Sequence, residues 1–187
     1  MRRILNLKSG AAFWLLLALA VACDSSIEHD DITKTVDEQE GYRDAKQNAD
    51  FVVKAIASNY AEIRLAQLAR DKSADTGTKE VATIIENDHA ELAELLLSYA
   101  IRKGISTPLE ETDDDKMEIS SLAREESAEE FDKKWCSALE ERQSDSIIKF
   151  ERCLDNTEDV ELKKLVTYAL PALRTHLVML NQNQASL

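Results

Sequence analysis

The amino-acid sequence predicts an all-α protein built around four long helices. The chain of 187 residues has only two prolines and four glycines, so few positions favour tight turns. Its apolar residues recur every three to four positions over four long stretches, as the buried stripe of an amphipathic helix does. A chain of this length can bury the core of one domain without disulfides or metals as supports.

The first 22 residues have the layout of a secretory signal peptide. Positive charges lie between Met1 and Lys8, and an unbroken apolar run of twelve residues follows from Ala11 to Ala22. Twelve residues span roughly 18 Å as a helix, whereas the hydrocarbon core of a bilayer is about 30 Å thick. The run is therefore too short for a permanent transmembrane helix, and we expect residues 1–22 to be removed on export.

The residues before Cys23, Leu19-Ala20-Val21-Ala22, resemble the lipobox of bacterial lipoproteins. The resemblance implies that a lipid is attached to Cys23 and that cleavage leaves this cysteine as the first residue. Each buried methylene of a lipid chain adds about 0.8 kcal/mol, so several acyl chains hold a protein stably where one does not. We therefore expect an exported lipoprotein of the cell envelope, anchored to a membrane through Cys23, on the periplasmic or the outer surface.

The rest of the chain is strongly acidic. Without residues 1–22 it has 20 basic and 36 acidic residues, a formal charge of −16, which excludes nucleic acid as a partner. Eleven of the residues between 24 and 46 are charged, and few are large and apolar. Such a segment cannot bury enough surface to offset the entropy lost on ordering. We expect residues 23–46 to be a flexible, lipidated tether and residues 47–187 to form the domain.

Two helices that form a hairpin are predicted at the start of the domain. The first covers residues 50–72 and the second residues 79–103, with a turn between them. Gly104 then stops the second helix. The apolar stripe of this second helix consists of Val81, Ile84, Ile85, Leu92, Leu95, Leu96 and Tyr99.

A long connection separates this hairpin from a second one. Residues 105–128 contain Pro108, an acidic run and a short apolar patch, which predicts a crossover with one short helix. The third and fourth long helices are predicted at residues 129–154 and 160–181, and Pro171 inside the fourth predicts a kink. Long crossovers occur in ferritin-like four-helix bundles, so we expect that fold.

Cys136 and Cys153 both fall on the predicted third helix. They are 17 residues apart, which is roughly 25 Å along a helix. A disulfide needs α-carbons within about 7 Å. We therefore expect two free thiols, with Cys136 filling space in the core.

Several short segments of the domain share the order and spacing of one bacterial family over residues 50–180. They are Asp50-Phe51-Val52, Glu62 to Ala69, Asp88-His89, Phe131-Asp132 with Trp135, and Leu170-Pro171-Ala172-Leu173 followed by His176-Leu177. These segments resemble the family catalogued as domain of unknown function 4142. The resemblance implies a ferritin-like fold and an exported location, and it implies no established reaction. The family often has a histidine on the third helix where this chain has Gln143.

A partial set of metal ligands lies on the predicted helices. A di-iron bundle uses one glutamate from each of two helices and Glu-x-x-His from each of the other two. Glu62 on the first helix and Glu140 on the third fit the two glutamates. On the fourth helix, however, Leu173 stands where a glutamate should precede His176. One ligand of the set is therefore absent.

The second predicted helix supplies the remaining candidates. Glu86 and His89 match Glu-x-x-His, but at 100° per residue Glu86 points away from the apolar stripe. Asp88 lies nearer the centre of the stripe than His89, so Asp88 is the expected inward acid and His89 its neighbour at a helix interface. The candidate metal ligands are then Glu62, Asp88, His89 and His176, for iron, manganese or zinc.

These residues have a second interpretation, as inward polar groups that hydrogen-bond one another. The sequence contains no nucleophile triad, phosphate loop or nucleotide fingerprint. We therefore expect a lipid-anchored bundle with a binding, structural or stress-related role and no catalysis. A metal-binding protein or oxidase is the alternative. A carrier of an apolar ligand is a third interpretation, which an internal cavity would favour.

Overall fold

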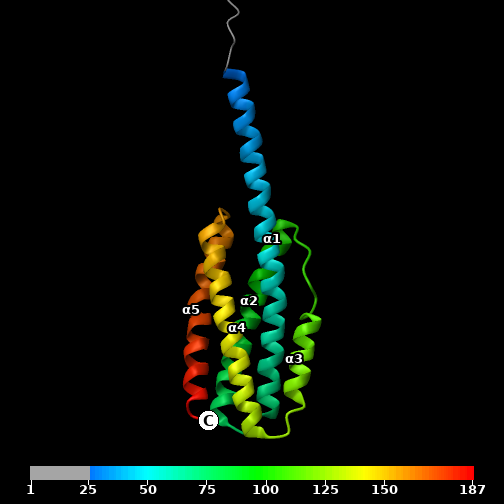
Figure 1. Cartoon of the computed structure of the whole chain (residues 1–187), viewed down its shortest axis with the longest axis vertical. Coiled ribbons are helices and arrows are strands. Elements are labelled where there is room, and N and C mark those ends of the chain that lie inside the picture. The colour runs from blue at the N-terminus through cyan, green and yellow to red at the C-terminus, as the bar shows by residue number, and fades with distance from the viewer. Residues whose placement is uncertain (1–25) are drawn as a thin grey trace, which may run out of the picture. The chain divides into compact units, whose positions relative to one another are not determined.

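The computed structural model describes residues 26–187, so the predicted signal peptide and Cys23 lie outside the described residues. Within residues 26–187 the protein is all-α and has no strand. Its five helices are α1 (Ser26–Lys72), α2 (Thr76–Lys103), α3 (Asp113–Ala123), α4 (Ala128–Asn156) and α5 (Val160–Gln184) (Figure 1). The chain divides into two units after Asp37, and the core lies in the unit Glu38–Leu187. None of the described helices is long and apolar enough to cross a membrane.

α1 begins at Ser26, well before Asp50, where its apolar stripe begins. The prediction of a flexible tether is therefore wrong from Ser26 onward, because residues 26–46 are helical. No proline interrupts residues 26–72, and an existing helix grows by one hydrogen bond per residue without a new nucleation cost. A highly charged segment can thus continue a helix that the apolar core stabilises further along.

The other helix ends fall at or near the predicted positions. α2 starts after Asp75, whose carboxylate accepts a hydrogen bond from the backbone N–H of Thr78 at 2.6 Å. It stops at Gly104, which has the left-handed φ of 66° that favours glycine. The short helix predicted in the crossover is α3, and Thr112 and Asp115 form its capping box.

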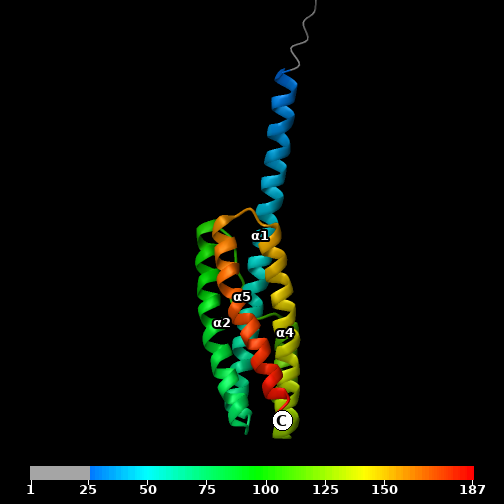
Figure 2. The same cartoon turned by 90° about the vertical axis from the view of Figure 1, so that its left-hand side faces the viewer.

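α1 and α2 form one antiparallel hairpin, and α4 and α5 form another (Figure 1 and Figure 2). α2 and α4 run in the same direction, because residues 104–127 lead the chain back along the domain to the start of α4 (Figure 1). Contacts at both ends of α2 define its antiparallel pairing with α5. Arg102 hydrogen-bonds Glu161 at one end, and Asn183 donates to Thr78 at the other. The short helix α3 lies against α4.

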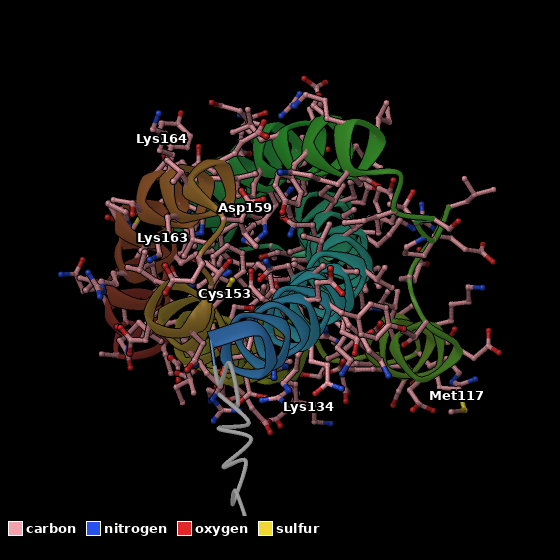
Figure 3. The ribbon with its side chains drawn as sticks, turned by 90° about the horizontal axis from the view of Figure 1, so that it is seen from above. Met117, Lys134, Cys153, Asp159, Lys163 and Lys164 are labelled. Carbon is pink, nitrogen blue, oxygen red and sulfur yellow. The ribbon has the colours of Figure 1, made fainter. Side chains whose placement is uncertain are left out.

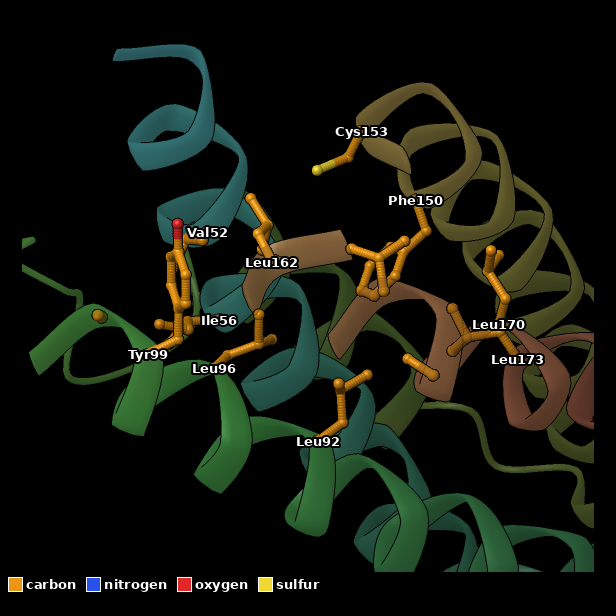
Figure 4. Packing of buried hydrophobic residues seen from close by; sticks show 14 residues of the cluster. Val52, Ile56, Leu92, Leu96, Tyr99, Phe150, Cys153, Leu162, Leu170 and Leu173 are labelled. Atoms are coloured by element: carbon orange, nitrogen blue, oxygen red, sulfur yellow. The ribbon is translucent and has the colours of Figure 1, made fainter. Parts of the chain in front are cut away.

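The four long helices enclose two apolar clusters. The first, here the Val52 cluster, is drawn in Figure 4 and includes Val52, Ile56, Leu92, Leu96, Tyr99, Phe150, Cys153, Leu162, Leu170 and Leu173. The second, here the Trp135 cluster, includes Leu65, Val81, Ile85, Phe131, Trp135, Cys136, Leu139 and Leu180. Each cluster receives side chains from α1, α2, α4 and α5. Charged side chains such as Lys164 point outward (Figure 3).

Cys136 and Cys153 are free thiols, as predicted, and both are buried. Burial raises the pKa of Cys136 to about 11 and the pKa of Cys153 to about 12. Both thiols are therefore protonated at neutral pH and behave as small apolar residues of the core.

Candidate functional site

A layer of four buried polar side chains separates the two apolar clusters. α1 contributes Glu62, α2 contributes His89, α4 contributes Gln143 and α5 contributes His176, and each is at most 1% exposed. On each helix this residue lies between members of the Val52 cluster and members of the Trp135 cluster. We call these four residues the polar layer. They lie in the middle of the core, where an unpaired polar group costs about 2–7 kcal/mol.

The carboxylate of Glu62 has hydrogen-bond partners on two helices. The side-chain amide of Gln143 donates to Glu62 Oε2 at 2.5 Å. The Ser58 hydroxyl donates to Glu62 Oε1 at 3.1 Å, and the Ser146 hydroxyl lies 3.5 Å from the same oxygen. Ser58 is one helical turn before Glu62, and Ser146 is nearly one turn after Gln143, so the helical repeat places them beside the layer. Neither serine is identified as a site residue from the sequence.

The imidazole of His89 is held from both sides of its ring. Asn59 donates its amide hydrogen to the carbonyl of Ala55 at 2.7 Å, so its side-chain oxygen faces His89 Nδ1 at 2.9 Å. His89 Nδ1 therefore carries a proton, and Nε2 of the neutral ring is an acceptor. The side-chain amide nitrogen of Gln143 lies 2.9 Å from this Nε2. Asn59 is a further site residue, and the sequence pattern gives no signal for it.

One proton must lie between Glu62 and His89. Glu62 Oε2 and His89 Nε2 are 3.0 Å apart, and two unprotonated acceptors at this distance would repel each other. Burial raises the pKa of Glu62 to about 7, against the opposing effects of Arg142 and Ser58. Burial also lowers the pKa of His89 to about 4. Below about pH 7 the proton therefore resides on Glu62, and a neutral carboxyl donates to a neutral imidazole.

The fourth member of the polar layer, His176, pairs with a carboxylate at the surface. His176 Nε2 lies 2.8 Å from Asp88 Oδ2, and the Asp88 side chain is 43% exposed. Burial lowers the pKa of His176, while the hydrogen bond to Asp88 raises it. His176 Nδ1 is buried and has no hydrogen-bond partner among the residues that the structure describes.

The expected orientation of Asp88 and His89 is wrong. The apolar stripe predicts that Asp88 points inward, but the buried residue is His89 and Asp88 lies at the surface. The reason is that Ile84 and Leu95, which were included in the stripe, are 40% and 37% exposed. At 100° per residue, Ile84 and Leu95 lie on the same side of α2 as Asp88. Counting them as buried therefore shifts the centre of the predicted apolar stripe toward Asp88.

The four predicted metal ligands, Glu62, Asp88, His89 and His176, do lie close together. The ring centroids of His89 and His176 are 5.3 Å apart. Each imidazole hydrogen-bonds its own carboxylate, so the four side chains form two pairs. Among the described residues, no three His, Cys, Asp or Glu side chains are grouped so that they could hold one metal ion.

The remaining candidates of the di-iron pattern lie away from the polar layer. Glu86 pairs with Arg70 and accepts a hydrogen bond from Gln67 at 3.1 Å, in agreement with the prediction that it points away from the apolar stripe. Glu140 Oε1 is buried without a hydrogen-bond partner in the described part of the chain. Leu173, at the position of the missing glutamate, belongs to the Val52 cluster.

Two cavities reach the polar layer from opposite helix pairs. One lies between α2 and α5, has a volume of about 220 Å³, and is lined by Asp88, His89 and His176 together with Tyr168. The other involves α1 and α4, also has a volume of about 220 Å³, and is lined by Glu62 and His89. His89 lines both cavities. The inner ends of both cavities therefore lie against the polar layer.

The fold occurs in a second protein whose sequence differs widely. A crystal structure of a DUF305 fragment from Deinococcus radiodurans superposes with a TM-score of 0.67 at 13% sequence identity. The match covers 75% of this chain and 97% of that chain, and at this identity it shows a shared fold alone. No curated protein matches the sequence. A family model described as a domain of unknown function, DUF4142, matches residues 34–182. The match spans most of the chain and includes the whole polar layer, so the protein belongs to the DUF4142 family.

Proposed function

We propose that the protein is a lipoprotein of the bacterial cell envelope whose ferritin-like four-helix bundle binds a ligand and catalyses no reaction. The lipobox-like residues before Cys23 support the anchor. The parallel direction of α2 and α4, joined by the long connection at residues 104–127, supports a ferritin-like bundle. The polar layer with its two cavities supports the binding role.

The observation that carries the binding role is that His89 lines both cavities. A polar layer inside an apolar core is costly, and apolar residues of similar size at these positions are often as stable or more stable. If the polar layer had only a structural role, cavities that reach it would not add to the stability of the fold. Ligand sites are commonly mostly apolar cavities with a few convergent polar groups, and the surroundings of His89 fit this description.

The anchor is tested by replacing Cys23 with serine in the full chain. Bacteria that express the protein with radiolabelled palmitate should incorporate label into the wild type, and Cys23→Ser should abolish the incorporation, because the serine cannot take the thioether-linked lipid. Cys136→Ser is the matched control, since it removes a thiol that is buried in the domain. Label in Cys23→Ser at the wild-type level, or no label in the wild type, would contradict lipid anchoring.

A metal ion is a second candidate ligand, and the 5.3 Å separation of the His89 and His176 rings favours it. Imidazole and carboxylate groups suit iron, manganese and zinc. For one ion to be held, the pairs Glu62–His89 and Asp88–His176 must exchange their hydrogen bonds for metal bonds. Burial favours neutral imidazole on both histidines, which is the form that binds metals.

The metal candidate predicts a stoichiometric ion in the full chain purified without chelators or a histidine tag, as measured by mass spectrometry. Glu62→Gln and His176→Ala should both lose the ion. Glu86→Gln should keep it, because Glu86 pairs with Arg70 away from the polar layer. Absence of metal after incubation with iron, manganese and zinc would reject this candidate. Turnover of a substrate by the metal-loaded protein would contradict the proposal that it only binds.

A further inference from the structure

A cleft at α1 and α4 leads from the surface to the polar layer. Its inner part has a volume of about 220 Å³, and its outer part has a volume of about 430 Å³. Both parts are lined by Phe51, Lys54, Lys149 and Arg152, so they adjoin each other. We call this space the α1–α4 cleft.

The inner part of the cleft has mostly apolar walls. They are formed by Phe51, Ala55, Leu92, Phe150 and Leu173. The rings of Phe51 and Phe150 meet edge to face, with centroids 5.0 Å apart, and Figure 4 shows Phe150 with Leu92 and Leu173 in one packed region. An engineered apolar cavity of roughly 150 Å³ takes up benzene. The inner part is therefore large enough for an apolar body of that size.

Three basic side chains surround the mouth of the α1–α4 cleft. Lys54, Lys149 and Arg152 are all exposed, and they line both of its parts. Lys54 and Arg152 form no ion pair with any residue that the structure describes, and Lys149 has only an exposed pair with Asp145 at 3.8 Å. Acidic residues outnumber basic ones by 36 to 23 in this chain. Asp50 is the one carboxylate among the described residues that line the outer part, so the three cations give the mouth a net positive charge.

We propose that the α1–α4 cleft binds a small monocarboxylate with an apolar body, such as an aromatic or short aliphatic acid. The apolar body lies in the inner part of the cleft, against the packed rings of Phe51 and Phe150, and the carboxylate stays at the mouth beside Lys54, Lys149 and Arg152. This inference rests on the proposed binding role and assigns a ligand class to it. It does not depend on the lipid anchor.

The floor of the cleft is compatible with an apolar body. Glu62 and His89 line the floor together with Ser58 and Ser146. Below the Glu62 pKa of about 7, the proton between Glu62 and His89 leaves both groups uncharged, so a ligand that reaches the floor does not meet a buried charge. Glu62 also has its acceptor oxygens occupied by Ser58 and Gln143. The charged end of the ligand therefore gains more at the basic mouth than at the floor.

Calorimetric titration of the full chain at low ionic strength, with and without phosphatidylcholine nanodiscs, tests the inference. Benzoate and hexanoate are the probes, and empty nanodiscs are the blank. We expect saturable binding of at least one probe. Benzamide has the shape of benzoate without its charge, and acetate has the charge without the apolar body. Both should bind at least about tenfold more weakly, because each lacks one half of the recognition.

Matched variants separate the cleft from the general surface. Lys54→Gln combined with Arg152→Gln should weaken probe binding at least about tenfold, since two of the three positive charges at the mouth are lost. Arg124→Gln combined with Lys164→Gln makes the same change of charge at exposed positions outside the cleft. That pair should change the affinity by less than about twofold. All four positions are exposed, so none of these changes should affect folding, which circular dichroism can verify.

Three results would overturn the inference. One is the absence of binding by both benzoate and hexanoate. Another is an equal loss of affinity in the two double variants, which would indicate general attraction of anions to the surface. The third is binding of inorganic phosphate or acetate as tight as that of benzoate. Failure of the lipid anchor would appear separately in the palmitate experiment, and a metal ligand would appear in mass spectrometry.

Discussion

Trp135→Ala is expected to lower the free energy of unfolding by about 3–5 kcal/mol. Trp135 is fully buried in the Trp135 cluster, where its indole N–H donates to the backbone carbonyl of Leu65 at 2.9 Å. The substitution removes a large aromatic side chain, leaves a cavity between α1 and α4, and breaks a hydrogen bond that links these helices. Domains have a total stability of about 5–15 kcal/mol, so this is a large share. Urea unfolding followed by circular dichroism measures it.

Two further variants identify the source of this loss. Trp135→Phe keeps much of the buried aromatic area and should cost only about 1–2 kcal/mol, mainly for the hydrogen bond and some lost volume. Tyr42→Ala removes an aromatic ring that is 75% exposed, so it should change stability by less than about 0.5 kcal/mol. A cost of Trp135→Ala below that of Trp135→Phe would contradict the packing that we describe.

Glu62→Gln and His89→Gln are expected to give the unfolding free energy opposite dependences on pH. In the wild type the pair holds one proton between about pH 4.5 and 6.5, whether the chain is folded or not. The proton is on Glu62 in the folded state, where the pKa is raised from 4.5 to about 7. In the unfolded state it is on His89, whose pKa is lowered from 6.5 to about 4 only by folding. Because folding neither takes up nor releases a proton at this pair between about pH 4.5 and 6.5, the pair does not make the unfolding free energy depend on pH in that range.

When one of the two residues is replaced, the protonation of the other makes the unfolding free energy depend on pH. In Glu62→Gln the unfolded state binds the extra proton between about pH 4 and 6.5 at His89, so stability rises with pH across this window. In His89→Gln the folded state binds the extra proton between about pH 4.5 and 7 at Glu62, so stability falls as pH rises. Each change amounts to about 3 kcal/mol at most over its window.

Urea unfolding at several pH values between 4 and 7.5 provides the measurement. Differences from the wild type at each pH remove the contributions of the many other carboxylates. Glu86→Gln is the matched control, because Glu86 lies outside the polar layer and pairs with Arg70. Parallel pH profiles for the wild type, Glu62→Gln and His89→Gln would show that no proton is shared between the two side chains.

The sequence is sufficient to predict features that depend on local chemistry. Gly104 ends α2 because a left-handed φ favours glycine, and this signal is visible in a single residue. Cys136 and Cys153 are free because a continuous helix keeps them apart. Glu62 and His176 are buried where a polar residue falls within an apolar stripe. The helical repeat alone is enough to place Glu62 and His176 inside the core.

Features that depend on neighbouring helices are harder to predict. The start of α1 at Ser26 follows from the extension of a helix that the core stabilises elsewhere, so composition alone misplaces it. The inward position of His89 depends on which parts of the α2 surface are covered, and the exposed Ile84 and Leu95 give a false signal. Asn59 holds His89 across a helix interface. Its contribution cannot be read from one helix alone.

The division of the core between two clusters also bears on how the chain folds. Neither hairpin can bury its apolar side chains alone, because each cluster needs residues from α1, α2, α4 and α5. During synthesis the first hairpin emerges before the second and cannot complete its packing until the second is present. Ordering the long connection at residues 104–127 costs entropy before the contacts between the hairpins form. Either hairpin alone would therefore expose the apolar side chains that it contributes to both clusters. The domain should behave as one cooperative unit in which both hairpins are gained and lost together.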